Sequence, residues 1–201
     1  MKPCVLLCNG LSGSGKSFFI KNYLPVDAFY KLRSATTRPM RNGEIANQEY
    51  FFVDESFFDI TRLATRLWVN KQIWQPGQPK WLYGVPESEI LDNPNINLVY
   101  DVIEPKYARQ LIDWFHLQRL GNKYTFKTLY FLPPDNNFEI AQSRANMPND
   151  ATVRHTNTCN PIDFLRAELD IDFLVKCSAT ETIISHRLRE FISRQSNVRP
   201  K

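Results

Sequence analysis

The sequence predicts an α/β protein with a central parallel sheet, because short apolar runs alternate with helical patterns and a glycine-rich loop joins the first pair. The first apolar run is Val5–Cys8, and the helical pattern after it is Lys16–Leu24, which Pro25 ends. The loop between them, GLSGSGKS, covers Gly10–Ser17. A strand, a glycine loop and a helix in this order are typical of the three-layer P-loop NTPase fold, whose helices cover both faces of the sheet.

Later segments repeat the order of strand and helix. The apolar run Ile96–Val102 contains Asp101 near its end and leads into a helical pattern that begins at Pro105. Three further elements continue the series: strands at Phe126–Leu132 and Ile171–Lys176, and a last helix at Thr182–Ser193. Ser178 and Glu181 have the spacing of a capping box before that helix. We therefore expect a parallel sheet with a helix after most strands.

Two polar, aromatic and turn-rich stretches interrupt this alternation and are interpreted as insertions into one domain over residues 1–201. With 43% hydrophobic residues the chain can bury one sizeable core. We expect that core at 1–30, 92–135 and 161–201, with insertions at 31–91 and 136–160.

Composition excludes several classes of protein. The 25 basic and 21 acidic side chains give a charge of only +4, so a nucleic-acid partner is not expected. No apolar run is long enough to cross a bilayer, so no membrane partner is expected either. The four cysteines, at positions 4, 8, 159 and 177, have neither metal-ligand spacing nor the density of a disulfide scaffold. These features favour the reducing cytoplasm.

The loop GLSGSGKS fits the P-loop pattern G-x-x-x-x-G-K-[ST] without a mismatch. Glycines let backbone N–H groups converge on a phosphate chain, the helix start adds partial positive charge, and a lysine adds a full one. We expect ATP to contact Gly10, Ser12, Gly13, Ser14, Gly15, Lys16 and Ser17, and Mg²⁺ to bind the Ser17 hydroxyl. The alternative is a glycine-rich turn with an incidental lysine. A P-loop serves kinases, ATPases and GTPases alike, but no Asn-Lys-x-Asp run of the kind that reads guanine in GTPases is present.

A second motif follows the P-loop helix. The segment RSATTRPMRNGEIANQEYFFVD, Arg33–Asp54, resembles the nucleotide-monophosphate-binding segment of guanylate kinases, which is close to R-S-x-T-T-R-x-x-R-x-G-E followed by Tyr-x-Phe. The Tyr83-Gly84 pair and Asp101 at a strand end extend the resemblance. It implies a guanylate kinase-like fold in which 31–91 binds the acceptor nucleotide and 136–160 forms a short lid.

The resemblance also implies roles for individual side chains. Those of the acceptor site are Ser34, Arg38, Arg41, Tyr50, Tyr83 and Asp101. The family's matching arginines clamp the acceptor phosphate, and a planar guanidinium suits two-oxygen phosphate contacts. Asp101 falls where the family places a carboxylate near magnesium. The alternatives are solvated surface arginines and an aspartate that caps a helix.

The expected lid contributes two more arginines. Arg144 and Arg154 resemble lid arginines that neutralise charge on the moving phosphoryl group, which would make them catalytic together with Lys16, Arg38 and Arg41. This segment is shorter than in the family and lacks its Arg-Gly-Thr/Glu run. The alternative is exposed loop charge.

Two departures from the family concern the base. No acidic residue occurs between Asn70 and Trp81, where the family carries a glutamate for guanine, and Val85 replaces the Thr or Ser after Tyr-Gly. Gln75 is a candidate substitute, because an amide offers both a donor and an acceptor to a base edge. GMP or dGMP is thus the first candidate acceptor, with the base left open.

The sequence as a whole favours an ATP- and Mg²⁺-dependent kinase of (deoxy)nucleoside monophosphates, acting as a monomer or homodimer. Two alternatives stay open. One is a non-catalytic guanylate kinase-like module that binds a protein, against which the intact P-loop argues. The other is a P-loop kinase of another small phosphorylated acceptor.

Overall fold

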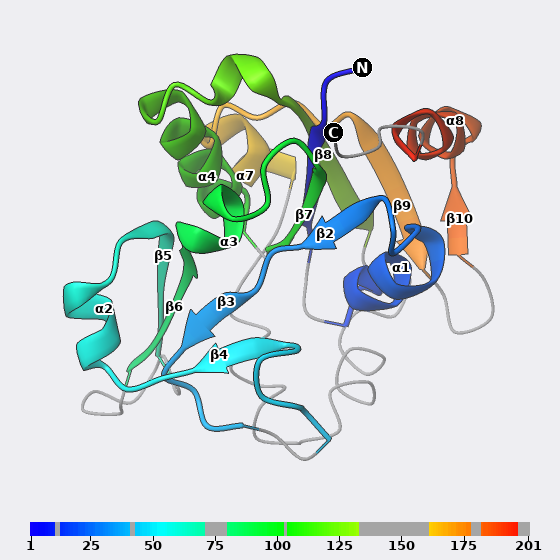
Figure 1. The fold of residues 1–201 in the computed structure, drawn as a ribbon. Coiled ribbons are helices and arrows are strands. Elements are labelled where there is room, and N and C mark those ends of the chain that lie inside the picture. Colours follow the sequence, from blue (N-terminus) through cyan, green and yellow to red (C-terminus); the bar gives the residue numbers. More distant parts are fainter. Residues whose placement is uncertain are drawn as a thin grey trace. The chain divides into compact units, whose positions relative to one another are not determined.

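The computed structural model describes residues 1–10, 13–40, 43–70, 80–102, 104–132, 161–177 and 182–196 (Figure 1). The chain divides into two compact units. The first combines Met1–Lys31 with Asn95–Lys201, and the second is Leu32–Pro94.

The first unit is built on a six-stranded sheet with the strand order β10-β9-β8-β1-β7-β2. The strands are β1 (Cys4–Asn9), β2 (Phe29–Lys31), β7 (Asn97–Asp101), β8 (Thr125–Leu132), β9 (Phe173–Cys177) and β10 (Thr182–Ile184). All neighbouring pairs from β2 to β9 are parallel, and β10 alone runs antiparallel to β9. Every residue of β1 is buried, as expected of a central strand covered on both faces.

Helices pack on both faces of this sheet. They are α1 (Lys16–Tyr23), α4 (Pro105–Leu117), α7 (Pro161–Arg166) and α8 (His186–Gln195), with a 3₁₀ turn at Gly121–Lys123. One core cluster joins Leu6 of β1 with Phe19 of α1 and Leu188 of α8. A second joins Tyr130 of β8 with Phe164 of α7. Since Tyr130 alternates with the first-cluster residues of its own strand, the two clusters lie on opposite faces, and the predicted three-layer α/β fold is confirmed.

The second unit contains a four-stranded sheet with the order β4-β3-β6-β5. Its elements are β3 (Ser34–Thr36), β4 (Tyr50–Phe52), α2 (Ser56–Ile60), β5 (Leu63–Asn70), β6 (Lys80–Pro86) and α3 (Ser88–Leu91). Strands β3 and β4 are parallel, and the other neighbouring pairs are antiparallel. A small core of Ala35, Phe58 and Leu82 supports this sheet.

The prediction of a helix over Thr182–Ser193 is wrong at its start. Thr182–Ile184 forms the edge strand β10, and the helix begins at His186 behind the N-cap Ser185, whose Oγ accepts a hydrogen bond from the Leu188 N–H at 3.2 Å. The β-branched Thr-Ile-Ile run fits a strand, and a serine that caps the next turn sets the boundary. The expected capping residues Ser178 and Glu181 lie outside the described residues. Within the described ranges, no helix has both the length and the apolar character needed to cross a membrane.

Candidate functional site

The glycine loop after β1 is shaped by close backbone packing. Gly10 has a φ of 151°, and a Cβ added there would lie 2.9 Å from both the Cβ and the carbonyl oxygen of Phe131 on β8. Gly15 has a φ of 93°, in the left-handed region, where it forms the N-cap of α1. Both conformations favour glycine, which explains why the motif has glycine at positions 10 and 15.

Lys16 lies inside this loop and is only 7% exposed. Its Nζ donates to the Gly10 carbonyl at 2.8 Å and lies 3.9 Å from Asp101 Oδ1. The Ser17 hydroxyl donates to Asp101 Oδ2 at 3.1 Å. Asp101 comes to this place because β7 pairs with β1 in a register that sets it opposite Cys8, two residues before Gly10. An ammonium, a hydroxyl and a carboxylate therefore meet at the carboxyl ends of two central strands.

In the second unit, Arg38 follows β3 and is 3% exposed. Its Nη2 donates to both carboxylate oxygens of Glu44, at 2.7 and 3.0 Å, and its Nη1 donates to the Pro39 carbonyl at 2.7 Å. The Arg38 backbone N–H donates to Thr36 Oγ1 at 3.1 Å. Burial lowers the pKa of the guanidinium, but the Glu44 hydrogen bond and the nearby Tyr83 raise it by more, so the pKa is raised and the group is fully charged.

Aromatic rings surround the Arg38 guanidinium. Its carbon lies 5.3 Å from the centre of the Tyr50 ring and 5.5 Å from that of Phe52. The Tyr50 and Tyr83 rings meet edge to face with centres 6.0 Å apart. Strand pairing sets Ser34 opposite Tyr50 in this sheet. The structure thus gathers Arg38, Tyr50 and Tyr83 in one cluster and places Ser34 beside it in the sheet.

Similar proteins point to one family. No protein-family model matches the chain. A guanylate kinase from Rickettsia felis is 24% identical over 205 residues, which cover 94% of this chain and 97% of that protein. A guanylate kinase from Rhodopirellula baltica is 34% identical over 93 residues, or 45% of this chain and 43% of the relative. The crystal structure of guanylate kinase from Anaplasma phagocytophilum shares the fold with a TM-score of 0.50 and 18% identity, covering 98% of this chain and 84% of that one.

The chain is similar to guanylate kinases in sequence and in fold. The first relatives are matched over only about half of their own length, 43% in Rhodopirellula baltica and 57% in Rickettsia conorii. The fold likeness extends over 98% of this chain.

Several predicted site residues lie outside the described residues. They are Ser12 of the loop, Arg41 and Gln75 of the acceptor insertion, and Arg144 and Arg154 of the expected lid. The sequence interpretation missed Glu44, the partner of Arg38. The signal was present, because Glu44 is the last letter of the R-x-G-E run in the quoted motif.

The residues around Lys16 fit a triphosphate chain and a magnesium ion. The buried hydroxyl of Ser14 has no hydrogen-bond partner among the described residues, although it lies at the centre of the loop. Ser17 and Asp101 offer the oxygen ligands that Mg²⁺ prefers. The described residues contain no cluster of three or more His, Cys, Asp or Glu, so a cation here would have few protein ligands. Mg²⁺ binds in this manner when substrate phosphates supply the remaining oxygens.

The two cysteines of β1 have no part in this chemistry. Burial raises the pKa of the Cys4 thiol to about 12. Burial, and then the negative charge of Asp101, also raises the pKa of Cys8. A thiol that stays protonated is a poor nucleophile and a poor metal ligand, so both side chains act as small apolar groups of the core.

Proposed function

We propose that this chain transfers the γ-phosphoryl group of ATP to a (deoxy)nucleoside monophosphate, with GMP or dGMP as the first candidate acceptor. The observation that carries the proposal is the convergence of Lys16, Ser17 and Asp101 behind a glycine loop that tolerates no Cβ at Gly10. The guanylate kinases among its relatives support the reaction class and the choice of acceptor.

On the donor side, the backbone N–H groups of the glycine loop and the Lys16 ammonium bind the phosphates of ATP. Lys16 is held ready by the Gly10 carbonyl, so little side-chain ordering is needed when the nucleotide binds. Ser17 and Asp101 hold magnesium, which supplies positive charge to the phosphate oxygens when it is bound. The lid arginines Arg144 and Arg154 add charge to the same phosphates.

On the acceptor side, Arg38, Arg41, Tyr50 and Tyr83 bind the phosphate of the monophosphate, and Ser34 binds near its base. Nη2 of Arg38 donates to both carboxylate oxygens of Glu44, so this guanidinium is placed where it binds an anion. Acceptor binding therefore competes with Glu44 for the same guanidinium. No general base is required, because the attacking phosphate oxygen is already anionic.

The residues expected to contact the base lead to a second candidate function. Val85 stands where the family carries a hydroxyl that meets the base, and its side chain is fully buried in the second unit. Gly84, beside it, is fixed by packing, since an added Cβ would lie 2.5 Å from the Thr65 carbonyl. This strand end therefore offers the base no polar side chain at position 85. We assign base contact to Gln75, and a kinase of another small phosphorylated acceptor is the second candidate.

The test is acceptor-dependent release of ADP from ATP across the common ribo- and deoxyribonucleoside monophosphates, with and without Mg²⁺. We expect turnover with a guanine monophosphate and none without the metal. Turnover only with a non-nucleotide phosphate ester would move the conclusion to the second candidate. If no acceptor reacts and ATP fails to stabilise the protein in a thermal shift, the chain is a non-catalytic interaction module.

A further inference from the structure

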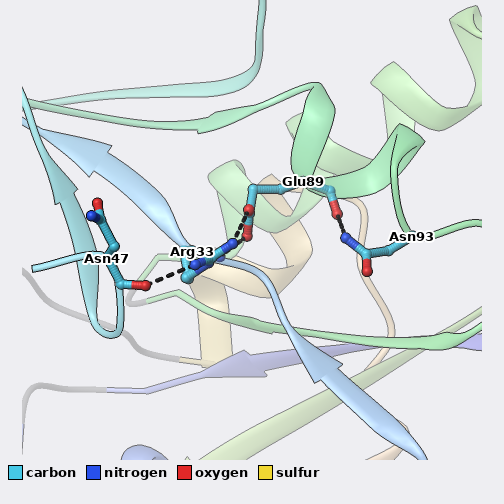
Figure 2. A network of polar contacts seen from close by, with 4 residues as sticks. All are labelled: Arg33, Asn47, Glu89 and Asn93. Atoms are coloured by element: carbon cyan, nitrogen blue, oxygen red, sulfur yellow. Dashed lines mark hydrogen bonds and ion pairs between the residues drawn. The ribbon is translucent and has the colours of Figure 1, made fainter.

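A partly buried ion pair joins Arg33 and Glu89 in the second unit (Figure 2). Glu89 of α3, with a side chain 6% exposed, accepts three hydrogen bonds from Arg33. They come from the backbone N–H at 2.9 Å, from Nε at 3.1 Å and from Nη2 at 2.7 Å. The carboxylate therefore fixes both the side chain and the backbone of Arg33. Asn93 donates to the Glu89 carbonyl at 3.0 Å and secures the end of α3.

The same arginine also holds the turn before β4. Its Nη1 donates to the Asn47 carbonyl at 2.7 Å, and the Asn47 N–H donates to the Tyr50 carbonyl at 3.0 Å. Asn47 has a φ of 65°, a left-handed conformation that the flanking bonds must maintain. One continuous chain of polar contacts therefore runs from Glu89 through Arg33 and Asn47 to the residue that carries the Tyr50 ring.

Two further features connect Arg33 with strands β3 and β4. Its guanidinium lies 4.6 Å from the centre of the Phe51 ring, and Phe51 directly follows Tyr50. Ser34 directly follows Arg33 and pairs with Tyr50 in the register of β3 and β4. The ion pair thus fixes the start of β3 and the start of β4 together.

We propose that Arg33 and Glu89 are positioning residues for the acceptor phosphate, acting through Asn47 on Tyr50 and hence on the aromatic wall around Arg38. This inference rests on the proposed function, since it assigns a role within the acceptor site. The guanidinium fork is essential to it, because one side chain must bind a carboxylate and a carbonyl in different directions.

The test is steady-state kinetics of the full chain with the acceptor and ATP varied separately. The variants are Arg33→Met, Arg33→Lys and Glu89→Gln. The matched control is Arg62→Met, which removes an arginine from an ion pair of the same unit, with Glu87 at 3.1 Å, where the arginine side chain is 77% exposed.

We expect Arg33→Met and Glu89→Gln to raise the KM for the acceptor about tenfold while the KM for ATP stays within about twofold. Arg33→Lys keeps the charge but loses the fork, so it should fall between wild type and Arg33→Met. Arg62→Met should match wild type. Equal changes in both KM values, or an acceptor KM within about twofold of wild type, would overturn the proposal.

Hydrogen exchange of the backbone amides gives a readout that needs no turnover. Arg33→Met and Glu89→Gln should speed exchange in peptides covering 45–52, whereas Arg62→Met should not. If the wild-type chain phosphorylates no monophosphate, the proposed function fails and this exchange alone decides whether the pair positions Tyr50. Unchanged exchange over 45–52 in both variants would end the inference.

Discussion

The two candidate phosphate-binding regions are built in different ways. In the first unit, the loop at Gly10–Ser17 depends on backbone conformation, and its lysine donates to a main-chain carbonyl. In the second unit, Arg38 is enclosed by the side chains of Glu44, Tyr50 and Phe52. The first region holds its charge against a backbone carbonyl, and the second holds its charge in an ion pair with Glu44.

This difference predicts distinct failures under mutation. Changes in the loop should affect folding and donor binding together, because the same backbone serves both. Changes around Arg38 should affect acceptor binding more than donor binding, because its bonding partners Thr36, Pro39 and Glu44 all belong to the second unit.

The largest effect is expected for Lys16→Met. Loss of the ammonium removes a full positive charge from the proposed donor site, so kcat/KM should fall by about 10²–10³. Lys21→Met is the matched control, because Lys21 is exposed in the last turn of the same helix. The measurement is acceptor-dependent ADP release. A loss below about tenfold would remove Lys16 from the donor site.

The next largest effect is expected for Arg38→Met, which tests the second region. A charged hydrogen bond contributes about 1.5–3 kcal/mol, so the KM for the acceptor should rise about 10- to 100-fold with the KM for ATP unchanged. Glu44→Gln, which weakens the competitor for the guanidinium, should change the acceptor KM far less. Isothermal titration with the acceptor alone would show whether binding itself is lost. A rise confined to the KM for ATP would contradict the assignment of Arg38.

Gly10→Ala tests whether the glycine loop depends on backbone packing at this position. The added Cβ meets Phe131 at 2.9 Å and the Ser14 hydroxyl at 3.0 Å, so the free energy of unfolding should fall by about 2 kcal/mol or more. Gly43→Ala is the control, since Gly43 has a φ of 84° and an added Cβ would have no atom of the described residues within 4 Å. It should cost only about 1 kcal/mol, from backbone strain alone. Equal losses in urea unfolding would show that packing against β8 is unimportant.

The smallest effect is expected for Asp101→Asn. The amide keeps the shape of the side chain but is a weaker ligand for magnesium, so the Mg²⁺ concentration for half-maximal rate should rise about tenfold. Asp113→Asn, on the half-exposed face of α4, should leave it unchanged. Titration of the rate with Mg²⁺ measures this concentration for both variants. An unaltered dependence in Asp101→Asn would place the metal elsewhere.

The sequence predicts the first region better than the second because the information is local in one and distant in the other. The loop from Gly10 to Ser17 lies between a buried strand and a helix, and its pattern specifies its conformation. The bond from Arg33 to Glu89 joins residues 56 positions apart, and nothing in either local segment indicates the pair. Glu44 was missed because the neighbouring arginines were interpreted for phosphate alone.

The error at the last helix has a similar cause. A Thr-Ile-Ile run is compatible with a helix or a strand, and only pairing with Cys177, Lys176 and Val175 of β9 decides for the strand. The antiparallel edge and the separate sheet of the second unit likewise depend on partners remote in sequence. A local motif therefore predicts the glycine loop, whereas tertiary contacts complete the region around Arg38.

We propose that this chain transfers the γ-phosphoryl group of ATP directly to a nucleoside monophosphate. The most direct measurement follows radiolabel from the γ-phosphate of ATP in the presence of GMP and Mg²⁺. The account predicts label in the nucleoside diphosphate made from GMP, absent with Lys16→Met and strongly reduced with Arg38→Met. Label released only as inorganic phosphate, at a rate that GMP does not change, would contradict it.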